Sequence, residues 1–211
     1  MISPRTRGRR RHGTPANEVR IIGGTWRSRR IRFPAVTVIR PTPDRVRETL
    51  FNWLGQDLTG RTCLDLFAGS GALGFEAASR GAKRVVMVEK DRIAYSALVH
   101  NRAALAADQV EVVQSDALEF LRADSDKYDV IFLDPPFATD YAERALPLLP
   151  QRMVPDACLY YEAGAGAVWP AGWRVIRESR AGQVFFQLAQ WTYHEPHGGL
   201  SGHVRSDHAG P

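Results

Sequence analysis

The chain has 211 residues, of which 44% are hydrophobic and 24% charged, and this suits one globular domain with a short appendage. It contains no apolar run of about 18 residues to span a bilayer and no apolar stretch typical of a signal peptide, so we expect a cytoplasmic protein without a membrane partner. Cys63 and Cys158 each lie in an apolar run, which favours reduced, buried thiols over a disulfide or a zinc site.

Positive charge is concentrated near the N-terminus. The first 47 residues hold thirteen Arg, no Lys and two acids, a net charge of +11, so the remaining 164 residues carry −6. Arg makes bidentate contacts with phosphate and stacks on bases, so this segment predicts a nucleic-acid partner. For residues 5–11 alone, a solvated tail explains the charge equally well. In the remainder we predict RNA contacts from six arginines: Arg20, Arg27, Arg30, Arg40, Arg45 and Arg47.

The N-terminal segment is expected to form a tail followed by a small RNA-binding unit. Residues 1–17 are polar and basic and show no periodicity, so we expect them to be disordered until a partner binds. The RNA-binding unit is predicted to span residues 18–58. Within it, the stretch from Val19 to Phe33, interrupted by Gly23 and Gly24, predicts a short hairpin with arginines on its exposed side.

A helix is predicted after the hairpin. Thr42 is expected to cap it, with Pro43 at the first helical position. Apolar residues then recur at helical spacing on one face, namely Val46, Leu50, Trp53 and Leu54. This spacing leaves Arg45 and Arg47 away from the buried face.

Residues 59–194 are predicted to form an α/β domain. Short β-rich runs alternate with amphipathic helices, and the runs are almost unbroken apolar stretches, which predicts a buried parallel sheet with helices on both faces. Such a sheet binds ligands at the carboxyl ends of its strands. The four predicted strands in this part are Thr62–Phe67, Arg84–Glu89, Val110–Gln114 and Tyr128–Leu133.

The pattern changes beyond Pro150. Three further strands are predicted, and a Gly-containing turn separates the last two, which indicates an antiparallel pair that completes the sheet. These strands are Ala157–Glu162, Trp173–Glu178 and Gln183–Trp191. Residues 195–211 are rich in Gly, His and Ser and are expected to be a flexible tail. The tail's histidines lack other strong ligands nearby, so we expect no metal.

A glycine-rich turn follows the first strand of this domain. Gly69, Gly71 and Gly74 fit the spacing of a loop that lets the backbone approach a cofactor, and Glu89 ends the next strand where a dinucleotide fold would place an acid. The pattern alone also fits a tight turn with close packing of helix on strand.

Four acids favour S-adenosylmethionine over a dinucleotide. Asp65, Glu89, Asp116 and Asp134 lie at or just beyond the ends of four successive strands. Acids there would repel a pyrophosphate, whereas they complement a sulfonium and an ammonium. We expect Glu89 to accept hydrogen bonds from ribose hydroxyls and Asp116 to bind the adenine amino group. The alternative for each acid taken singly is a helix cap.

The sequence Asp134-Pro135-Pro136-Phe137 directly follows a buried strand. Two prolines fix the backbone, so the Asp134 side chain and the Pro135 carbonyl can act as rigid acceptors. Such acceptors orient an exocyclic amino group for in-line attack on a methyl carbon and stabilise the developing positive charge. Phe137 can stack on a base that has left its helix. The alternative is a simple turn.

Several segments resemble the bacterial 16S ribosomal RNA guanine-N2 methyltransferases. The resemblance covers most of the chain and is carried by Arg20–Arg27, Arg40–Leu54, Phe67–Gly74, Asp134–Phe137 and Ala181–Val184. It implies a Rossmann-like class I methyltransferase fold with a mostly parallel seven-stranded sheet, S-adenosylmethionine as methyl donor, and guanine N2 in 16S rRNA as the target.

The resemblance also implies roles for individual residues. Asp134 to Phe137 would form the catalytic turn, and the segment from Arg40 to Glu48 would lie near the RNA. Together with the acids, it predicts a cofactor-binding set made of Asp65, Phe67, Ala68, Gly69, Ser70, Gly71, Glu89, Lys90, Asp116 and Ala117. We expect a monomer that acts on the small ribosomal subunit or an assembly intermediate.

Other functions fit parts of the sequence. An amino-group methyltransferase acting on DNA adenine or on a protein glutamine would use the same turn. The Arg-rich segment disfavours a protein substrate, and the small appendage disfavours sequence-specific DNA recognition. A non-catalytic RNA-binding assembly factor would leave the Asp134 turn unexplained. In a dehydrogenase, Asp65 and Asp134 would repel the cofactor.

Overall fold

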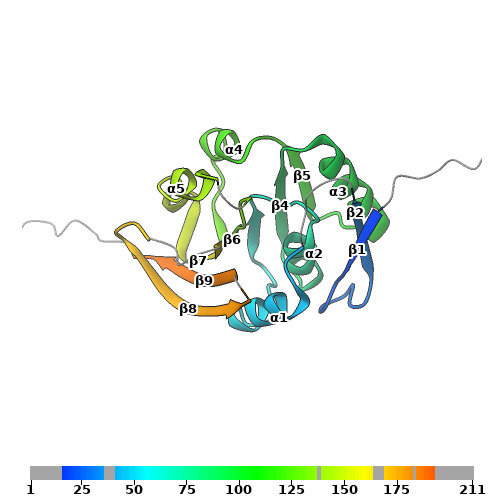
Figure 1. The fold of residues 1–211 in the computed structure, drawn as a ribbon, viewed down its shortest axis with the longest axis horizontal. Helices are drawn as coiled ribbons and strands as arrows, with labels where there is room; N and C mark the ends of the chain where they lie inside the picture. Colours follow the sequence, from blue (N-terminus) through cyan, green and yellow to red (C-terminus); the bar gives the residue numbers. More distant parts are fainter. Residues whose placement is uncertain (1–15, 36–40, 137–138, 164–168, 183, 193–211) are drawn as a thin grey trace, which may run out of the picture.

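The computed structural model describes residues 16–35, 41–136, 139–163, 169–182 and 184–192. The predicted terminal tails lie almost entirely outside these residues. A seven-stranded sheet forms the centre of the molecule, with strand order β5-β4-β3-β6-β7-β9-β8 (Figure 1). Its strands are β3 (Thr62–Asp65), β4 (Arg84–Glu89), β5 (Val110–Gln114), β6 (Tyr128–Leu133), β7 (Met153–Ala163), β8 (Trp173–Ala181) and β9 (Val184–Trp191).

Strands β3 to β7 are parallel, and β9 pairs antiparallel with both β7 and β8. The predicted mostly parallel sheet with an antiparallel C-terminal pair is therefore confirmed. The central strands are apolar on both faces because helices cover both. In β4, the residues from Val85 to Val88 are all buried.

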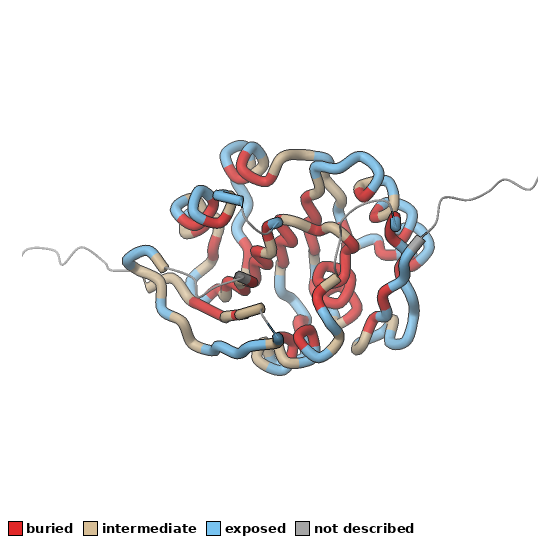
Figure 2. Tube along the Cα trace, viewed as in Figure 1, coloured by how far each residue is buried: buried red, intermediate tan, exposed pale blue. Residues whose placement is uncertain are grey.

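Helices cover the two faces of the sheet (Figure 1), and much of the central strands is buried (Figure 2). A separate hydrophobic cluster lies on each face. One cluster includes side chains of α1 (Asp44–Trp53), α2 (Ala72–Ser79) and α3 (Arg92–Leu105). The other includes side chains of α4 (Ala117–Ala123) and α5 (Tyr141–Ala145), with the short 3-10 helix η1 (Leu149–Arg152) before β7. No helix in the described part of the chain is long and apolar enough to cross a membrane.

The N-terminal hairpin is part of the same core as the sheet. Its strands β1 (Ala16–Arg20) and β2 (Arg30–Pro34) pair antiparallel. The prediction that the disordered tail extends to residue 17 is therefore wrong, because Ala16 and Asn17 pair with Pro34 and Phe33. Ile31 and Phe33 are buried in the cluster that contains α1, α2 and α3. Asn101 of α3 holds the β2 backbone, since its side chain accepts from the Arg32 amide at 3.0 Å and donates to the Arg32 carbonyl at 2.8 Å. The N-terminal unit predicted from the sequence is thus anchored on the α/β domain.

Helix α1 begins one residue later than predicted. Asp44 is its first residue and Pro43 occupies the N-cap position, without a side-chain cap hydrogen bond. The expectation that Thr42 caps this helix is therefore wrong. Because Pro43 has an extended ψ of 149°, Thr42 lies outside the helix, where it lines the same cavity as Asp134.

A buried carboxylate on α2 binds the loop of the N-terminal hairpin and an arginine of α1. Glu76 is fully buried and accepts hydrogen bonds at 2.8 Å from the amides of Ile22 and Gly23. It also pairs with the Arg47 guanidinium at 3.3 Å and the Arg80 guanidinium at 2.8 Å. Two charged and two neutral donors thereby satisfy one carboxylate, which makes its burial tolerable.

The predicted RNA contact by Arg47 is wrong. Only 1% of the Arg47 side chain is exposed. Besides Glu76, its guanidinium donates to the Thr42 carbonyl at 3.1 Å, to the Arg20 carbonyl at 2.8 Å and to Asp44 at 2.6 Å. With its donors directed at these protein acceptors, Arg47 is a structural residue that fixes the start of α1.

The loop between β1 and β2 also contacts the end of α2 directly. The Ser79 carbonyl accepts from the Thr25 amide at 2.8 Å, and the Ser79 hydroxyl accepts from the Trp26 amide at 2.9 Å. The Ser79 hydroxyl itself donates to the Gly23 carbonyl at 2.6 Å. Gly24 permits this approach, because a Cβ at that position would lie 1.8 Å from the Ser79 carbonyl oxygen.

We predict that Glu76→Ala strongly destabilises the protein, because it leaves Arg47 and Arg80 buried without their shared partner. Breaking a buried ion pair in this way costs about 3–5 kcal/mol, measured as the free energy of unfolding in urea. The control is Glu111→Ala, which removes an exposed partner of Arg84 and should cost less than about 1 kcal/mol. Equal losses in the two variants would contradict the central role of Glu76.

Candidate active site

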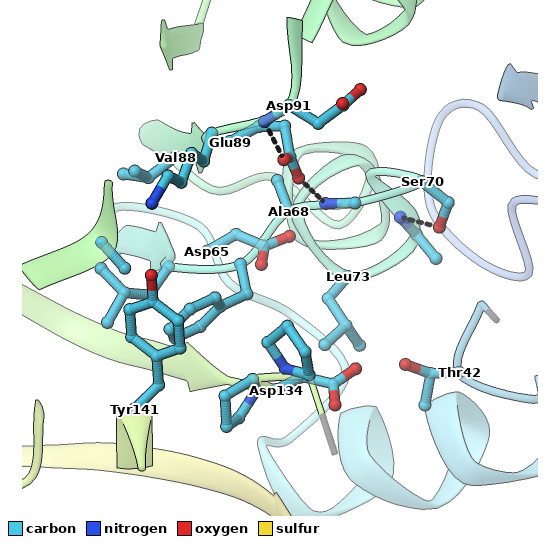
Figure 3. Close-up of a pocket in the computed structure, with 18 of the residues that line it drawn as sticks. Thr42, Asp65, Ala68, Ser70, Leu73, Val88, Glu89, Asp91, Asp134 and Tyr141 are labelled. Carbon is cyan, nitrogen blue, oxygen red and sulfur yellow. Dashed lines mark hydrogen bonds between the residues drawn. The ribbon is translucent and has the colours of Figure 1, made fainter. Parts of the chain in front are cut away.

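One cavity of about 700 Å³ lies at the carboxyl ends of β3, β4, β5 and β6 (Figure 3). Its volume is in the range of small-molecule and cofactor sites. Twelve of the predicted catalytic and cofactor-binding residues line it: Asp65, Phe67, Ala68, Gly69, Ser70, Glu89, Lys90, Asp116, Ala117, Asp134, Pro135 and Pro136. The structure therefore brings together residues from the ends of four strands, as the sequence predicted.

The glycine turn between β3 and α2 is held by Glu89. One oxygen of this carboxylate accepts from the Gly69 amide at 2.8 Å, and the other accepts from the Asp91 amide at 2.7 Å. Gly71 is the N-cap of α2 with a φ of 79°, and a Cβ there would lie 2.7 Å from Leu98 and Phe75. Gly71 does not line the cavity, so its role is to form the turn on which the cavity depends.

Asp65 is a buried acid in the wall of this cavity. Its side chain accepts a hydrogen bond from the Gly74 amide at 3.0 Å. Burial, opposed by the Gly74 and Phe67 amides and assisted by the charge of Glu89, raises the pKa of Asp65 to about 7. An ionised Asp65 would therefore gain from a cation placed in the cavity.

Asp116, just after β5, is another acid in the wall of the cavity. It caps α4 by accepting from the Leu118 amide at 2.9 Å, and it also accepts from the Tyr141 hydroxyl at 2.6 Å and from Lys90 at 3.1 Å. Burial opposes ionisation, but these hydrogen bonds outweigh it and lower the pKa of Asp116 to about 2. Asp116 is thus an anion at neutral pH, and its capping role does not exclude a second role in binding.

Asp134 lies at the end of β6 with Pro135 and Pro136 directly after it. In Figure 3 its carboxyl group and the Thr42 side chain lie on the same side of the cavity, below the glycine turn. Burial and the neighbouring acids Glu162 and Asp65 raise the pKa of Asp134 well above its usual range, while a hydrogen bond with Thr42 lowers it. The last predicted residue of the turn, Phe137, lies outside the described residues.

The predicted RNA-binding arginines occupy different environments. Arg20, Arg27, Arg30 and Arg45 are exposed, Arg47 is buried, and Arg40 lies outside the described residues. Arg20 pairs with Asp44 at 3.1 Å and Arg30 pairs with Glu18 at 3.1 Å. Both are exposed ion pairs, which contribute little to stability and can be exchanged for contacts with phosphate.

The residues of the cavity fit S-adenosylmethionine better than an anionic cofactor. Acids line the wall, with Asp65, Glu89 and Asp116 at the ends of three adjacent strands, and they complement the ammonium and sulfonium groups. Within the described ranges, no group of three or more His, Cys, Asp or Glu side chains is arranged to hold a metal ion.

Sequence reasoning missed several cavity residues. Tyr141 binds Asp116 from α5, and no pattern in the sequence indicates that contact. Thr42 was predicted to cap a helix. It lies in the Arg40–Leu54 segment that carries the family resemblance, and this could have indicated a functional role. The other lining residues not predicted are Pro41, Leu66, Ala72, Leu73, Val88, Asp91 and Ser115.

Comparison with known proteins identifies relatives that match most of the chain. A family model described as Conserved hypothetical protein 95 matches residues 19–190. The chain is 42% identical over 181 residues to ribosomal RNA small subunit methyltransferase D of Escherichia coli strain K12, covering 83% of this chain and 91% of that protein. The protein of the same name from Haemophilus influenzae is 41% identical over 181 residues, covering 82% and 94%.

Solved structures share the fold. A putative methyltransferase from Escherichia coli aligns with a TM-score of 0.77 at 42% identity, covering 84% of this chain and 100% of that one. A T. thermophilus 16S rRNA N2 methyltransferase, solved with AdoMet and guanosine, aligns with a TM-score of 0.64 at 22% identity, covering 85% and 50%, and this likeness concerns the fold alone. The fold, the cavity and these matches agree with the resemblance seen in the sequence, and the chain belongs to the ribosomal RNA small subunit methyltransferase D family.

Proposed function

We propose that this protein methylates the exocyclic N2 amino group of a specific guanine in 16S rRNA, with S-adenosylmethionine as methyl donor. The observation that carries the proposal is that the Asp134-Pro135-Pro136 turn shares one cavity with the acid-lined glycine turn. Relatives named ribosomal RNA small subunit methyltransferase D support the choice of RNA as substrate.

The cofactor would be held by the residues at the ends of β3, β4 and β5. When bound, S-adenosylmethionine supplies an electrophilic methyl group. Asp65 would bind its positively charged amino acid part, Glu89 the ribose hydroxyls, and Asp116 the adenine amino group. The Gly69 and Asp91 amides leave lone pairs on Glu89 for the ribose hydroxyls. Asp116 already accepts from Leu118, Glu119, Tyr141 and Lys90, so the adenine amino group would take the place of the exposed Lys90 ammonium.

Asp134 and Pro135 would prepare the guanine amino group for attack. The lone pair of this nitrogen is delocalised into the ring, which makes the group a weak nucleophile. A side-chain oxygen of Asp134 and the Pro135 carbonyl would accept its two hydrogens, direct the lone pair toward the methyl carbon and stabilise the charge that develops on nitrogen. Phe137 would stack on the extruded base.

The exposed arginines of the N-terminal segment favour RNA over the alternatives. The hairpin and α1 present Arg20, Arg27, Arg30 and Arg45 to solvent, which suits a phosphate backbone and not a protein amide. A DNA adenine enzyme would need a larger recognition surface than this hairpin and helix provide. We further propose that the protein acts as a monomer in the cytoplasm, on the small subunit or an assembly intermediate.

Methyl transfer to ribosomal subunits tests the function and the role of Asp134 together. Small subunits from a strain lacking this gene should gain radiolabelled methyl from S-adenosylmethionine, and nucleoside analysis should identify N2-methylguanosine. Asp134→Ala should reduce kcat by about 10²-fold or more, with cofactor affinity nearly unchanged, because the lost acceptor acts mainly in the transition state.

The outcomes of this experiment distinguish a wrong role for Asp134 from a wrong function for the protein. An active Asp134→Ala variant would remove Asp134 from catalysis while leaving the function intact. If the wild-type protein labels neither subunits nor naked RNA, the proposed function is wrong, and DNA, protein and non-catalytic roles have to be tested instead.

We predict that Asp65→Asn weakens cofactor binding and stabilises the free protein at high pH. The pKa of Asp65, about 7, is above its usual 3.8, so the folded protein holds a proton that the unfolded chain releases. This contribution to stability is complete below pH 3.8 and is lost as the pH rises through about 7. Binding of a cationic cofactor should show the opposite trend, because it favours ionised Asp65.

Calorimetry and thermal melting at pH 6 and pH 8 measure both effects. The wild-type protein should bind S-adenosylmethionine more tightly at pH 8, by up to about tenfold for each unit of pKa change. Asp65→Asn should bind it more weakly, with a smaller pH dependence, and should melt at a higher temperature than the wild type at pH 8. Wild-type affinity in the variant at both pH values would exclude Asp65 from the cofactor site.

We predict that replacing Arg30 and Arg45 with Gln weakens RNA binding and lowers its salt dependence. Each lost phosphate contact should reduce the slope of log K against log salt by about 1. The matched control is Arg144→Gln on α5, an exposed arginine paired with Asp140 on the opposite face of the sheet. Filter binding to 16S rRNA across a salt series measures the slopes, and an unchanged slope would remove Arg30 and Arg45 from the interface.

A further inference from the structure

Glu162 is a buried acid close enough to Asp134 to raise its pKa, and the proposed mechanism does not use it. It is not among the described residues that line the cavity. Leu133 of β6 pairs in parallel register with Tyr161 of β7, so Asp134 and Glu162 are the next residues on adjacent strands. Phe132 and Tyr160, two residues earlier, both belong to the cluster on the α1 face. Because side chains alternate along a strand, Asp134 and Glu162 leave the sheet on that same face.

The Glu162 carboxyl group has one hydrogen-bond donor in the described part of the chain, but no positively charged partner there. Its residue is 6% exposed, and its carboxyl accepts a hydrogen bond from the Tyr160 hydroxyl at 2.9 Å. Among the residues that the structure describes, no Lys, Arg or His forms an ion pair with Glu162 or Asp134. Glu76, the other buried glutamate in the described part of the chain, pairs with two arginines. A buried acid without a cation is costly and indicates that a ligand supplies further donors.

The two acids influence one another. Burial raises the pKa of Glu162, and the Tyr160 hydroxyl partly offsets the increase. The pKa of Asp134 is raised well above its usual range by burial and then by Glu162. The titratable groups facing this pair are Tyr160 on β7 and Asp65 on β3, while β9 places Phe186 opposite Glu162. One negative charge shared by the pair is thus favoured over two.

We infer that Glu162 selects guanine, by accepting a hydrogen bond from N1–H while Asp134 holds the neighbouring N2 amino group. The inference rests on the proposed function and adds the residue that determines its base specificity. Guanine presents N1–H and the amino group side by side as donors, which matches two adjacent acceptors. In adenine and cytosine the ring nitrogen beside the amino group carries a lone pair, which would face the Glu162 carboxylate and be repelled.

Substitution of the target base by 2-aminopurine tests this inference directly. This analogue keeps the 2-amino group, but its N1 has a lone pair in place of the hydrogen. Small subunits would be reconstituted from ligated 16S rRNA that carries either guanine or 2-aminopurine at the nucleotide mapped by the labelling experiment. The measured quantity is the ratio of kcat/KM for the two bases.

The wild-type enzyme should prefer guanine by about 10- to 100-fold, the range expected for a hydrogen bond to a charged group. Glu162→Gln should reduce this ratio by about tenfold or more, because the new amide can donate to N1 of 2-aminopurine. The matched control is Glu143→Gln, an exposed acid on α5, which should keep the wild-type ratio. A merely structural role of Glu162 would lower both rates equally and leave the ratio unchanged, which would overturn the inference.

Tyr160→Phe provides a second test if Glu162→Gln does not fold, as judged by circular dichroism and cofactor binding. The variant keeps the buried ring and removes only the hydroxyl that lowers the pKa of Glu162. If ionised Glu162 reads the base, the acid limb of kcat/KM for guanine should move to higher pH. An unmoved limb would contradict the inference. Absence of methyl transfer by the wild-type enzyme would instead refute the proposed function itself.

Discussion

The structure depends on the burial of one negative charge. Glu76 lies on the helix that starts at the glycine turn, and its carboxylate binds the loop of the N-terminal hairpin and the Arg47 side chain of α1. An acid in this position is unfavourable unless all its partners are in place, so the hairpin, α1 and α2 are stabilised together. The same contacts hold the backbone of Thr42, through Arg47, close to the catalytic turn.

The cavity concentrates negative charge from one edge of the sheet. Asp65, Glu89, Asp116 and Asp134 are each stabilised by backbone amides or hydroxyl groups and lack a buried arginine of the kind found near Glu76. Burial and neighbouring acids raise the pKa of Asp65 and of Asp134, so a negative charge on either of these two is unfavourable in the free protein. A cationic methyl donor and a base with two adjacent donors are the ligands that relieve it, which links affinity to the cost of folding the empty site.

The sequence predicted local features well and missed contacts between distant segments. The strand β4 and the position of Asp134 followed from apolar runs and from the fixed backbone of two prolines. The exposure of Arg47 was predicted wrongly, because its buried partner Glu76 lies 29 residues away on another helix and no local spacing indicates the pair. Thr42 carried a capping signal that Pro43 overrode, and its contact with Asp134 depends on how α1 packs against the sheet. For Glu89 and Asp116, the sequence allowed either a structural role in a turn or cap or a role in cofactor binding. Both are compatible with the structure, since each residue holds a backbone turn and also lines the cavity.

The attachment of the hairpin loop to Ser79 has a consequence for the choice of substrate. The Ser79 hydrogen bonds and the close approach of Gly24 hold the loop against the end of α2. If these arginines bind RNA as proposed, the protein fixes the distance between them and Asp134. The enzyme would therefore select a guanine by its distance from the phosphates that the arginines bind. Only a guanine that the folded RNA places at this fixed distance would reach Asp134. Selection by distance requires no contacts with the bases beside the target. It also means that the RNA, and not the protein, must change conformation when the two bind.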